Sequence, residues 1–369
     1  MRKIFYAKPS VTELEINYVT DAIKNGWADQ CYDYIKRLQS SFCDYLDSKH
    51  SLATSSCTGA LHIAFAALGI KEGDEVIVPD ITWIASVAPL VYLKAKPVFV
   101  DVLPDSWCID PEKIERAITK KTKAILAVHL YGNLVEMDAV LEIARKYSLA
   151  VVEDAAEALG SEYKNQKAGS IADFGVFSFH GTKTVTTGEG GMLVTNRQDL
   201  FDEANIMADH GRDPSINKIF WMERIGYKYK MSNLQAAMGC AQIERADELV
   251  NKKREVFNWY QEYARNIPYL SWNLEPAYTK NSFWMPTIIF DNSYKIERDD
   301  LIQKMIAENI CVRPFFYPLS SLPMFEDKEE SKISYSIYNR GINLPSYFDL
   351  TCDDVRYVCE KLGWFLGCK

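Results

Sequence analysis

The sequence lacks the features that mark membrane, secreted and nucleic-acid-binding proteins. It has no run of about 18 apolar residues that would span a membrane, and no signal-peptide-like apolar run follows its first residues. None of its nine cysteines forms a C-x-x-C pair, so we expect reduced, mostly structural thiols, a cytoplasmic location and no metal site. Its formal net charge of −8 argues against nucleic acid as the main partner, because such partners require clustered lysines and arginines.

The composition that is present is that of a globular chain with more than one domain. The 369 residues are 48% hydrophobic and 25% charged, and chains of this length usually divide. We expect an N-terminal segment at residues 1–30, a large α/β domain at residues 31–250 and a smaller C-terminal α+β domain at residues 251–369.

Apolar strand-like runs alternate with helical patterns from about residue 50 to residue 196. Continuous apolar runs are typical of strands that are covered on both faces, and their alternation with helices predicts a mainly parallel sheet. The expected strands are residues 75–78, 97–102, 124–129, 149–154, 175–179 and 191–195. The expected helices between them include residues 111–118 and 137–147.

The remainder of the chain has a different pattern. Residues 233–253 read as one long helix, and a strand at residues 283–290 precedes a helix at residues 298–309. A strand at residues 310–313 and a closing helix at residues 352–365 complete the smaller domain.

A loop with one lysine and several glycines gives the strongest local signal. Ser178 lies near the end of an expected strand, Lys183 follows it, and Gly188 and Gly190 then lead into the next strand. Glycines let a backbone approach a bound molecule, and a lysine that loses solvation becomes a better nucleophile. The segment alone fits a glycine-rich turn with a surface lysine equally well.

Asp154 ends another apolar strand of the same expected sheet. Open α/β sheets bind ligands beyond the carboxyl ends of their strands, so the carboxylate lies where a ligand is expected. In an enzyme that uses pyridoxal 5′-phosphate (PLP), such an aspartate pairs with the protonated ring nitrogen. An aspartate that caps a helix explains the position equally well.

Two further features suit the same cofactor. Residues 55–59 open an almost wholly apolar helix that ends near Gly69, and a helix N-terminus offers free amide donors to a phosphate. A capping serine before a buried helix is the simpler alternative. Trp83 follows a strand end, where its flat ring can stack on a cofactor, although core packing explains a lone tryptophan more simply.

Taken together, these features resemble fold-type I PLP enzymes and, more closely, the nucleotide-sugar aminotransferase family. The similarity covers nearly the whole chain and is greatest to the GDP-perosamine synthases. The stretches that carry it are residues 73–79 (GDEVIVP), 127–132 (AVHLYG), 153–158 (EDAAEA), 187–192 (TGEGGM), 226–233 (GYKYKMSN), 313–318 (RPFFYP) and 340–346 (RGINLPS). The resemblance implies an α/β PLP-transferase fold with a mainly parallel central sheet, helices on both faces and a smaller α+β domain.

The resemblance also implies a role for each matching residue. Lys183 would form the Schiff base with PLP, Asp154 would contact the ring nitrogen, and Glu157 would lie near the ring hydroxyl. Trp83 would cover one face of the ring. Lys228 would reach the phosphate in the neighbouring subunit of a homodimer with shared active sites. The residues implied around the phosphate of the same subunit are Ser56, Cys57, Thr58, Gly59 and Ser178.

Three stretches depart from the pattern of the perosamine synthases. Ser56-Cys57 replaces Asn-Gly, Lys228 replaces an asparagine, and His180-Gly181-Thr182 replaces Phe-Gly-Asn. A lysine can still meet a phosphate as a point charge. These changes bear on the identity of the sugar more than on the reaction.

The implied reaction moves an amino group from L-glutamate to a nucleotide-linked keto sugar. The expected substrate is GDP-4-keto-6-deoxymannose, converted to GDP-perosamine for surface polysaccharide such as lipopolysaccharide O-antigen. Candidate substrate-binding residues are His180, Arg212, Arg313, Tyr317 and Arg340, with structural salt bridges as the alternative for each arginine. A UDP- or dTDP-linked sugar, a PLP-dependent sugar dehydratase and a non-catalytic binding protein are the other hypotheses. Lys183 argues against the dehydratases, which carry histidine at that position.

Overall fold

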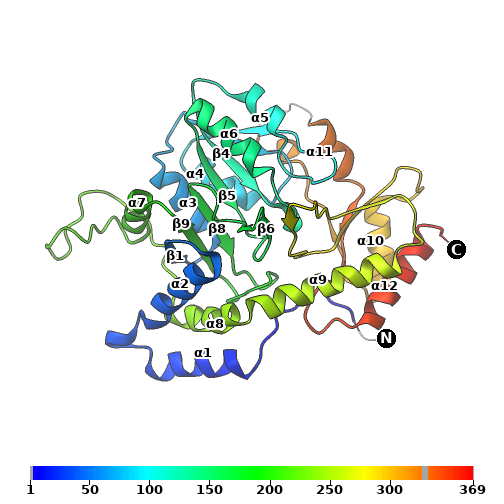
Figure 1. Ribbon diagram of the computed structural model, residues 1–369, viewed down its shortest axis with the longest axis horizontal. Helices are drawn as coiled ribbons and strands as arrows, with labels where there is room; N and C mark the ends of the chain where they lie inside the picture. The colour runs from blue at the N-terminus through cyan, green and yellow to red at the C-terminus, as the bar shows by residue number, and fades with distance from the viewer. Residues whose placement is uncertain (1–2, 326–330, 369) are drawn as a thin grey trace.

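The computed structural model describes residues 3–325 and 331–368, and a seven-stranded sheet forms its centre (Figure 1). In order across the sheet, its strands are β1 (His50–Thr54), β9 (Gly191–Thr195), β8 (Phe174–Ser178), β5 (Ala150–Asp154), β4 (Thr122–Val128), β2 (Glu75–Pro79) and β3 (Lys96–Val100). The strands from β3 to β8 pair in parallel, and β9 runs antiparallel to both of its neighbours. The mainly parallel sheet expected from the sequence is therefore confirmed.

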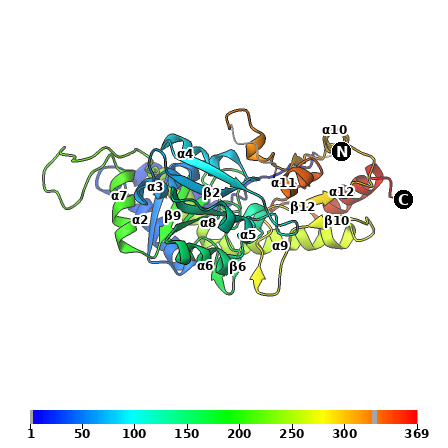
Figure 2. The same ribbon diagram turned by 90° about the horizontal axis from the view of Figure 1, so that it is seen from above.

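Helices cover both faces of this sheet, because its strand residues alternate between two apolar layers. Ile77 of β2 packs in one layer, whereas Val76 and Val78 pack in the other. The first layer includes α2 (Asp33–Leu46), α5 (Pro111–Ala117), α6 (Met137–Tyr147) and α8 (Asn233–Glu244), and the second includes α3 (Cys57–Ala67), α4 (Ala88–Tyr92) and α7 (Gln198–Ala208). Figure 2 shows α4 and α6 on opposite sides of the sheet, and α1 (Glu13–Asn25) packs on α8.

A second, four-stranded sheet lies toward the two chain ends (Figure 2). Its strands are, in order, β10 (Leu270–Trp272), β12 (Thr287–Phe290), β14 (Gly341–Asn343) and β13 (Arg313–Pro314). It shares an apolar cluster with α9 (Ala246–Tyr263), α10 (Arg298–Ala307) and α12 (Cys352–Phe365). Helix α9 runs from the large sheet to this smaller one and therefore crosses the predicted boundary at residue 250. The division of the chain at residues 30 and 250 stays a prediction.

Two smaller elements join the large and small sheets. The strands β11 (Thr279–Lys280), β6 (Glu162–Tyr163) and β7 (Gln166–Lys167) form a short antiparallel sheet from both regions of the chain. The helix α11 (Lys332–Ile337) contributes Ile337 to an apolar cluster with Trp107, Tyr131 and Trp284. This cluster lies beside the candidate site described below.

The strands and helices predicted between residues 75 and 195 are confirmed, with ends that differ by two residues or fewer. The closing helix, α12, is confirmed with the predicted ends, and α10 ends two residues earlier than expected. The strand β1 was not expected, because its five residues carry no alternating pattern that separates a strand from a loop.

The prediction of one helix at residues 233–253 is wrong. Arg245 separates α8 from α9, with backbone angles of φ −104° and ψ 8°. Its guanidinium donates to the carboxylates of Glu15 and Glu248, so the break is fixed by side-chain contacts. Neither glycine nor proline marks it in the sequence. The break separates α8, which packs on α1 and α2, from α9, which continues to the small sheet.

Two predicted strands of the smaller domain are also partly wrong. The strand expected at residues 283–290 begins only at Thr287, because Phe283 has a left-handed backbone (φ 49°) and stacks on Phe257. The strand expected at residues 310–313 is reduced to β13, and Ile310 instead pairs with Ile4 in an isolated bridge. None of the helices formed by residues 3–325 and 331–368 is both long and apolar enough to cross a lipid bilayer.

Candidate active site

A cavity of about 420 Å³ opens where the parallel strands end. Val128, Asp154 and Ser178 line it, and they are the last residues of β4, β5 and β8. This edge is where open α/β sheets hold their ligands, because side chains and loops from several strands converge there. Nine of the candidate cofactor- and substrate-binding residues line this cavity: Ser56, Cys57, Thr58, Trp83, Asp154, Glu157, Ser178, His180 and Lys183.

The N-terminus of α3 forms one wall of the cavity. Ser56 caps this helix, and its Oγ accepts a hydrogen bond of 3.0 Å from the Gly59 amide. A Cβ on Gly59 would lie 3.0 Å from the ring of Tyr229, so a side chain here would require that ring to move by a few tenths of an ångström. The remaining amide donors of the first turn, with the hydroxyls of Thr58 and Ser178, offer the groups that bind phosphate.

Asp154 is buried at the base of the cavity, and its carboxylate is held from two directions. Ser86 Oγ donates to Oδ2 at 2.8 Å, and the Ala156 amide donates to Oδ1 at 3.1 Å. Burial raises the pKa of Asp154, while these two donors and the nearby Lys183 oppose the rise. Sequence reasoning missed Ser86, although it lies one helical turn beyond Trp83 in a stretch that was already of interest.

Lys183 projects its Nζ between a carboxylate and an aromatic ring. Nζ lies 3.3 Å from Oε1 of Glu157, whose other oxygen accepts a hydrogen bond of 2.8 Å from the Tyr131 amide. Burial raises the pKa of Glu157, and the charge of Lys183 opposes that rise. On the other side, Nζ lies 3.8 Å from the ring centroid of Trp284, a residue that sequence reasoning missed.

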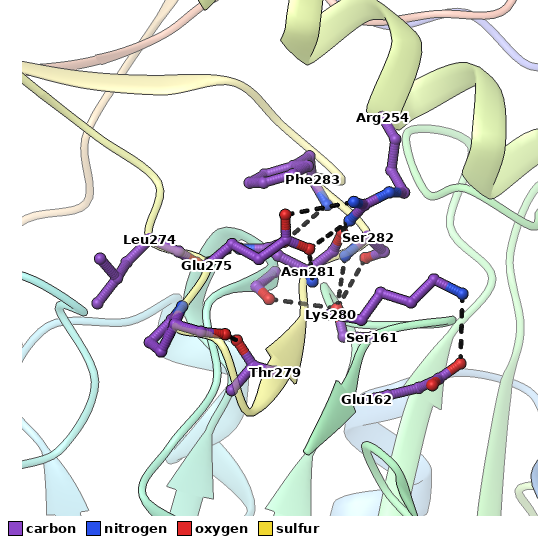
Figure 3. A network of polar contacts seen from close by, with 12 residues as sticks. Ser161, Glu162, Arg254, Leu274, Glu275, Thr279, Lys280, Asn281, Ser282 and Phe283 are labelled. Atoms are coloured by element: carbon purple, nitrogen blue, oxygen red, sulfur yellow. Dashed lines mark hydrogen bonds and ion pairs between the residues drawn. The ribbon is translucent and has the colours of Figure 1, made fainter. Parts of the chain in front are cut away.

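The segment that leads to Trp284 is fixed by a polar network (Figure 3). Arg254 of α9 binds the carboxylate of Glu275 and the carbonyl of Asn281. The Ser282 amide donates to Ser161 Oγ at 2.9 Å, which ties the segment to the loop beyond β5. No sequence motif indicates a role for Trp284, because Trp284 contacts Lys183 only through this tertiary arrangement.

Trp83 and His180 lie at the mouth of the cavity. The indole of Trp83 is 58% exposed and tilts toward the Phe316 ring, with 5.9 Å between the ring centroids. The Nδ1 atom of His180 accepts a hydrogen bond of 3.3 Å from the Thr182 amide. That Nε2 lies 3.8 Å from the carboxylate of Glu189.

The remaining candidates fall into two groups. Arg313 and Tyr317 line a second, mostly apolar cavity of about 660 Å³ that shares Trp83 and Phe316 with the first. Arg340 donates to the backbone carbonyls of Phe290 and Ser336, and it does not line either cavity.

Arg212 and Lys228 also lie outside both cavities. Lys228 Nζ is 3.6 Å from Asp209, and its side chain is largely exposed. The part of the chain that the structure describes holds no group of three or more histidine, cysteine or acidic side chains arranged to bind a metal ion.

Several known proteins are similar to this chain in sequence and in fold. Residues 9–363 match the model of the DegT/DnrJ/EryC1/StrS aminotransferase family. The GDP-perosamine synthase of Escherichia coli O157:H7 is 38% identical over 370 residues, which cover 100% of both chains. The GDP-perosamine synthase of Caulobacter vibrioides is also 38% identical, over 99% of this chain and 98% of that protein. The PLP form of Spr1654 from Streptococcus pneumoniae superposes with a TM-score of 0.91 at 26% identity, over 99% of each chain.

Proposed function

Because the chain belongs to the DegT/DnrJ/EryC1/StrS aminotransferase family, we propose that it aminates a GDP-linked keto sugar. The protein is a PLP-dependent aminotransferase. The proposed donor is L-glutamate, and the proposed reaction converts GDP-4-keto-6-deoxymannose into GDP-perosamine. The observation that carries this choice is the end-to-end similarity to GDP-perosamine synthases at 38% identity.

The residues of the first cavity fit PLP. The first turn of α3 and Ser178 supply donors for its phosphate, and Asp154 supplies a buried carboxylate for its ring nitrogen. Trp83 offers a ring face, Glu157 an acceptor for the ring hydroxyl, and Lys183 an amine for the covalent link. When bound, the cofactor supplies a conjugated ring that takes up the electron pair released at a substrate carbon.

Lys183 carries the proton transfers in this proposal. With the cofactor in place, the free Nζ would take the proton from the α-carbon of L-glutamate and deliver it to the cofactor. In the second half of the reaction, it returns a proton to the sugar carbon that receives the amino group. Asp154, held by Ser86 and Ala156, keeps a negative charge at the far end of the cavity throughout.

The second cavity suits the nucleotide sugar. It adjoins the first at Trp83 and Phe316, so a molecule that fills it would place one end beside Lys183. Its mostly apolar lining fits a deoxy sugar, and Arg313 supplies a positive charge for a diphosphate. His180, at the rim of the first cavity, is the further candidate for a sugar contact. Arg212 and Arg340 line neither cavity, so their contact with the nucleotide stays a prediction.

The assay that tests this function offers L-glutamate with GDP-, UDP- and dTDP-linked 4-keto-6-deoxy sugars in parallel. We expect the amino sugar, identified by mass spectrometry, from the GDP-linked substrate at a kcat/KM at least about tenfold above the others. A preference for a UDP- or dTDP-linked sugar would contradict the substrate while leaving the aminotransferase intact. Loss of the 3-hydroxyl without amination would instead indicate a dehydratase.

The proposal includes a homodimer whose subunits share their active sites. It is supported by Lys228, which is exposed and outside the cavity of its own subunit. It is also supported by the projecting loop after α7 (Figure 1), on which Ile219, Phe220 and Ile225 are each more than 80% exposed. A cytoplasmic location and a role in lipopolysaccharide O-antigen synthesis complete the proposal.

Replacing Lys228 with alanine is expected to weaken cofactor retention about tenfold, because a charged contact to the partner subunit's phosphate group is lost. Equilibrium dialysis of the dimer measures this directly. Lys230→Ala is the matched control, because Lys230 also lies within 4 Å of Asp209, at 3.7 Å. Equal cofactor affinity in Lys228→Ala, Lys230→Ala and the parent protein would refute the shared site.

A further inference from the structure

A tyrosine of the N-terminal arm, residues 3–8, lies where the two cavities of the candidate active site meet. Four residues line both cavities: Tyr6, Thr82, Trp83 and Phe316. Of these, Tyr6 and Thr82 carry a hydroxyl, and Thr82 Oγ1 is already paired with Ser86 Oγ at 3.2 Å. The Tyr6 hydroxyl has no hydrogen-bond partner within the part of the chain that the structure describes, so it can bind a ligand.

Backbone hydrogen bonds anchor the N-terminal arm to the segments before β13 and after β14. The Ile4 amide donates to the carbonyl of Asn309, and the Cys311 amide donates to the carbonyl of Ile4, each at 2.9 Å. The Ser346 amide donates to the carbonyl of Tyr6 itself at 3.0 Å. The arm therefore presents the Tyr6 side chain from a fixed backbone position, as a binding residue requires.

A buried lysine holds the residue to which the Tyr6 backbone is bonded. Lys253 of α9 is 8% exposed, and its Nζ donates to the carbonyl of Ser346 at 2.7 Å and to the Ser346 hydroxyl at 3.2 Å. Lysine is almost never fully buried unless its ammonium has partners, so these two contacts hold the segment after β14 against α9. The backbone around Tyr6 is thus supported from a second element of the fold.

The Tyr6 phenol interacts with one charged group from each cavity. The guanidinium of Arg313, in the second cavity, lies over the Tyr6 ring at 5.7 Å from the centroid. Burial raises the pKa of Tyr6, the negative charge of Glu157 in the first cavity raises it further, and Arg313 opposes the rise. The phenol therefore keeps its proton at neutral pH, where it acts as a hydrogen-bond donor.

A hydroxyl donor at this junction suits the sugar of the proposed substrate. A nucleotide sugar that fills the second cavity has to place its keto carbon beside Lys183, so its sugar lies at the junction. A keto sugar carries carbonyl and hydroxyl oxygens that lose contact with water there, and a buried polar group without a partner weakens binding. Because the second cavity is mostly apolar, the Tyr6 hydroxyl is a valuable partner for one of these oxygens.

We propose that the Tyr6 hydroxyl donates a hydrogen bond to an oxygen of the sugar and so orients the keto carbon toward Lys183. This role rests on the proposed function and adds to it a substrate-binding residue outside the motifs that the sequence offers. It concerns the sugar alone, so the nucleotide and the reaction with L-glutamate depend on other residues.

The first experiment compares the binding of GDP-perosamine with that of GDP. Both are titrated calorimetrically into enzyme loaded with pyridoxamine 5′-phosphate, in which the amino sugar does not react further. Tyr6→Phe keeps the ring beneath Arg313 and removes only the hydroxyl. Its Kd for GDP-perosamine is expected to rise about fivefold to fiftyfold, while its Kd for GDP stays within about twofold of the parent value. An unchanged Kd for GDP-perosamine, or an equal rise for both ligands, overturns the proposal.

The second experiment separates the two halves of the reaction. In single turnovers, Tyr6→Phe should react with L-glutamate at a rate within about twofold of the parent, and with the keto sugar about tenfold more slowly at subsaturating concentration. A merely structural role would slow both halves together, and that result refutes the proposal. Tyr338→Phe is the matched control, because Tyr338 packs on the same apolar cluster as Tyr6 but lines neither cavity. It should change neither half.

Failure of the proposed function gives a different result. A parent protein that aminates a UDP- or dTDP-linked sugar in preference to the GDP-linked sugar refutes the proposed substrate. The comparison is then made with the amino sugar product and the free nucleotide of that preferred substrate, and Tyr6→Phe keeps the same expectation. Unchanged binding of that product by Tyr6→Phe refutes the role of Tyr6 whatever the nucleotide.

Discussion

Replacing Lys183 with alanine is expected to reduce amino transfer at least about 10³-fold, because both the covalent link and the proton carrier are lost. The amine is the group that the cavity brings between Glu157 and Trp284, 13% exposed and within reach of a bound substrate. The absorption band of the lysine-linked cofactor should disappear in the variant, while the noncovalent cofactor contacts at α3 and Asp154 remain. Single-turnover kinetics with L-glutamate measure the loss directly.

Lys167→Ala is the matched control for that experiment. Lys167 is also partly buried and also pairs with a glutamate, Glu162, at 3.4 Å, but it lies on β7 outside both cavities. It should leave the band and the rate unchanged. Retention of more than about a tenth of the parent rate in Lys183→Ala would show that another group transfers the proton.

The sequence predicted the part of the site that is built from strand ends. Asp154 ends an apolar run and Lys183 follows one, and parallel strands bring such positions to one edge whatever the details of packing. Thr58 was found instead from the apolar helix that it helps to open. The same logic explains why the central sheet was predicted well. Its strands are buried on both faces and read as continuous apolar runs.

The residues that were missed reach the site through tertiary contacts. Trp284 lies about a hundred residues beyond Lys183 in the chain, and its Nε1 meets Thr182 only because the small sheet packs beside the large one. The Tyr131 amide that donates to Glu157 is a backbone group, so the type of residue at position 131 does not indicate this contact. The break at Arg245 has the same origin, since contacts with Glu15 and Glu248 override a helical pattern that continues through it.

Asp154→Asn is expected to lower activity about 10³-fold while making the cofactor-free protein more stable. The loss of activity follows because a neutral amide no longer supplies the negative charge that keeps the cofactor's ring nitrogen protonated. The gain in stability follows from burial, which raises the pKa of Asp154 above its usual 3.8. The folded chain therefore binds the proton more tightly than the unfolded chain does.

The raised pKa of Asp154 determines the pH range in which the variant is more stable than the parent protein. For an acid whose pKa is raised by folding, stability is highest below the unfolded value and falls as the pH rises through the folded value. At neutral pH the buried, ionised Asp154 lowers the free energy of unfolding of the parent protein, and the asparagine variant carries no such charge. The melting temperature of the variant should therefore be higher at pH 7 by a few degrees, and the difference should vanish near pH 3.

Two further variants make the interpretation specific. Asp80→Asn removes another buried carboxylate whose pKa is raised by burial and which accepts hydrogen bonds from Ser320, but it lies outside the first cavity. It should share the stability trend without the loss of activity. Ser86→Ala removes the donor to Asp154 Oδ2, which raises the pKa of Asp154 further, so an intermediate loss of about tenfold is expected. An Asp154→Asn enzyme with nearly full activity would assign the ring nitrogen to a different partner.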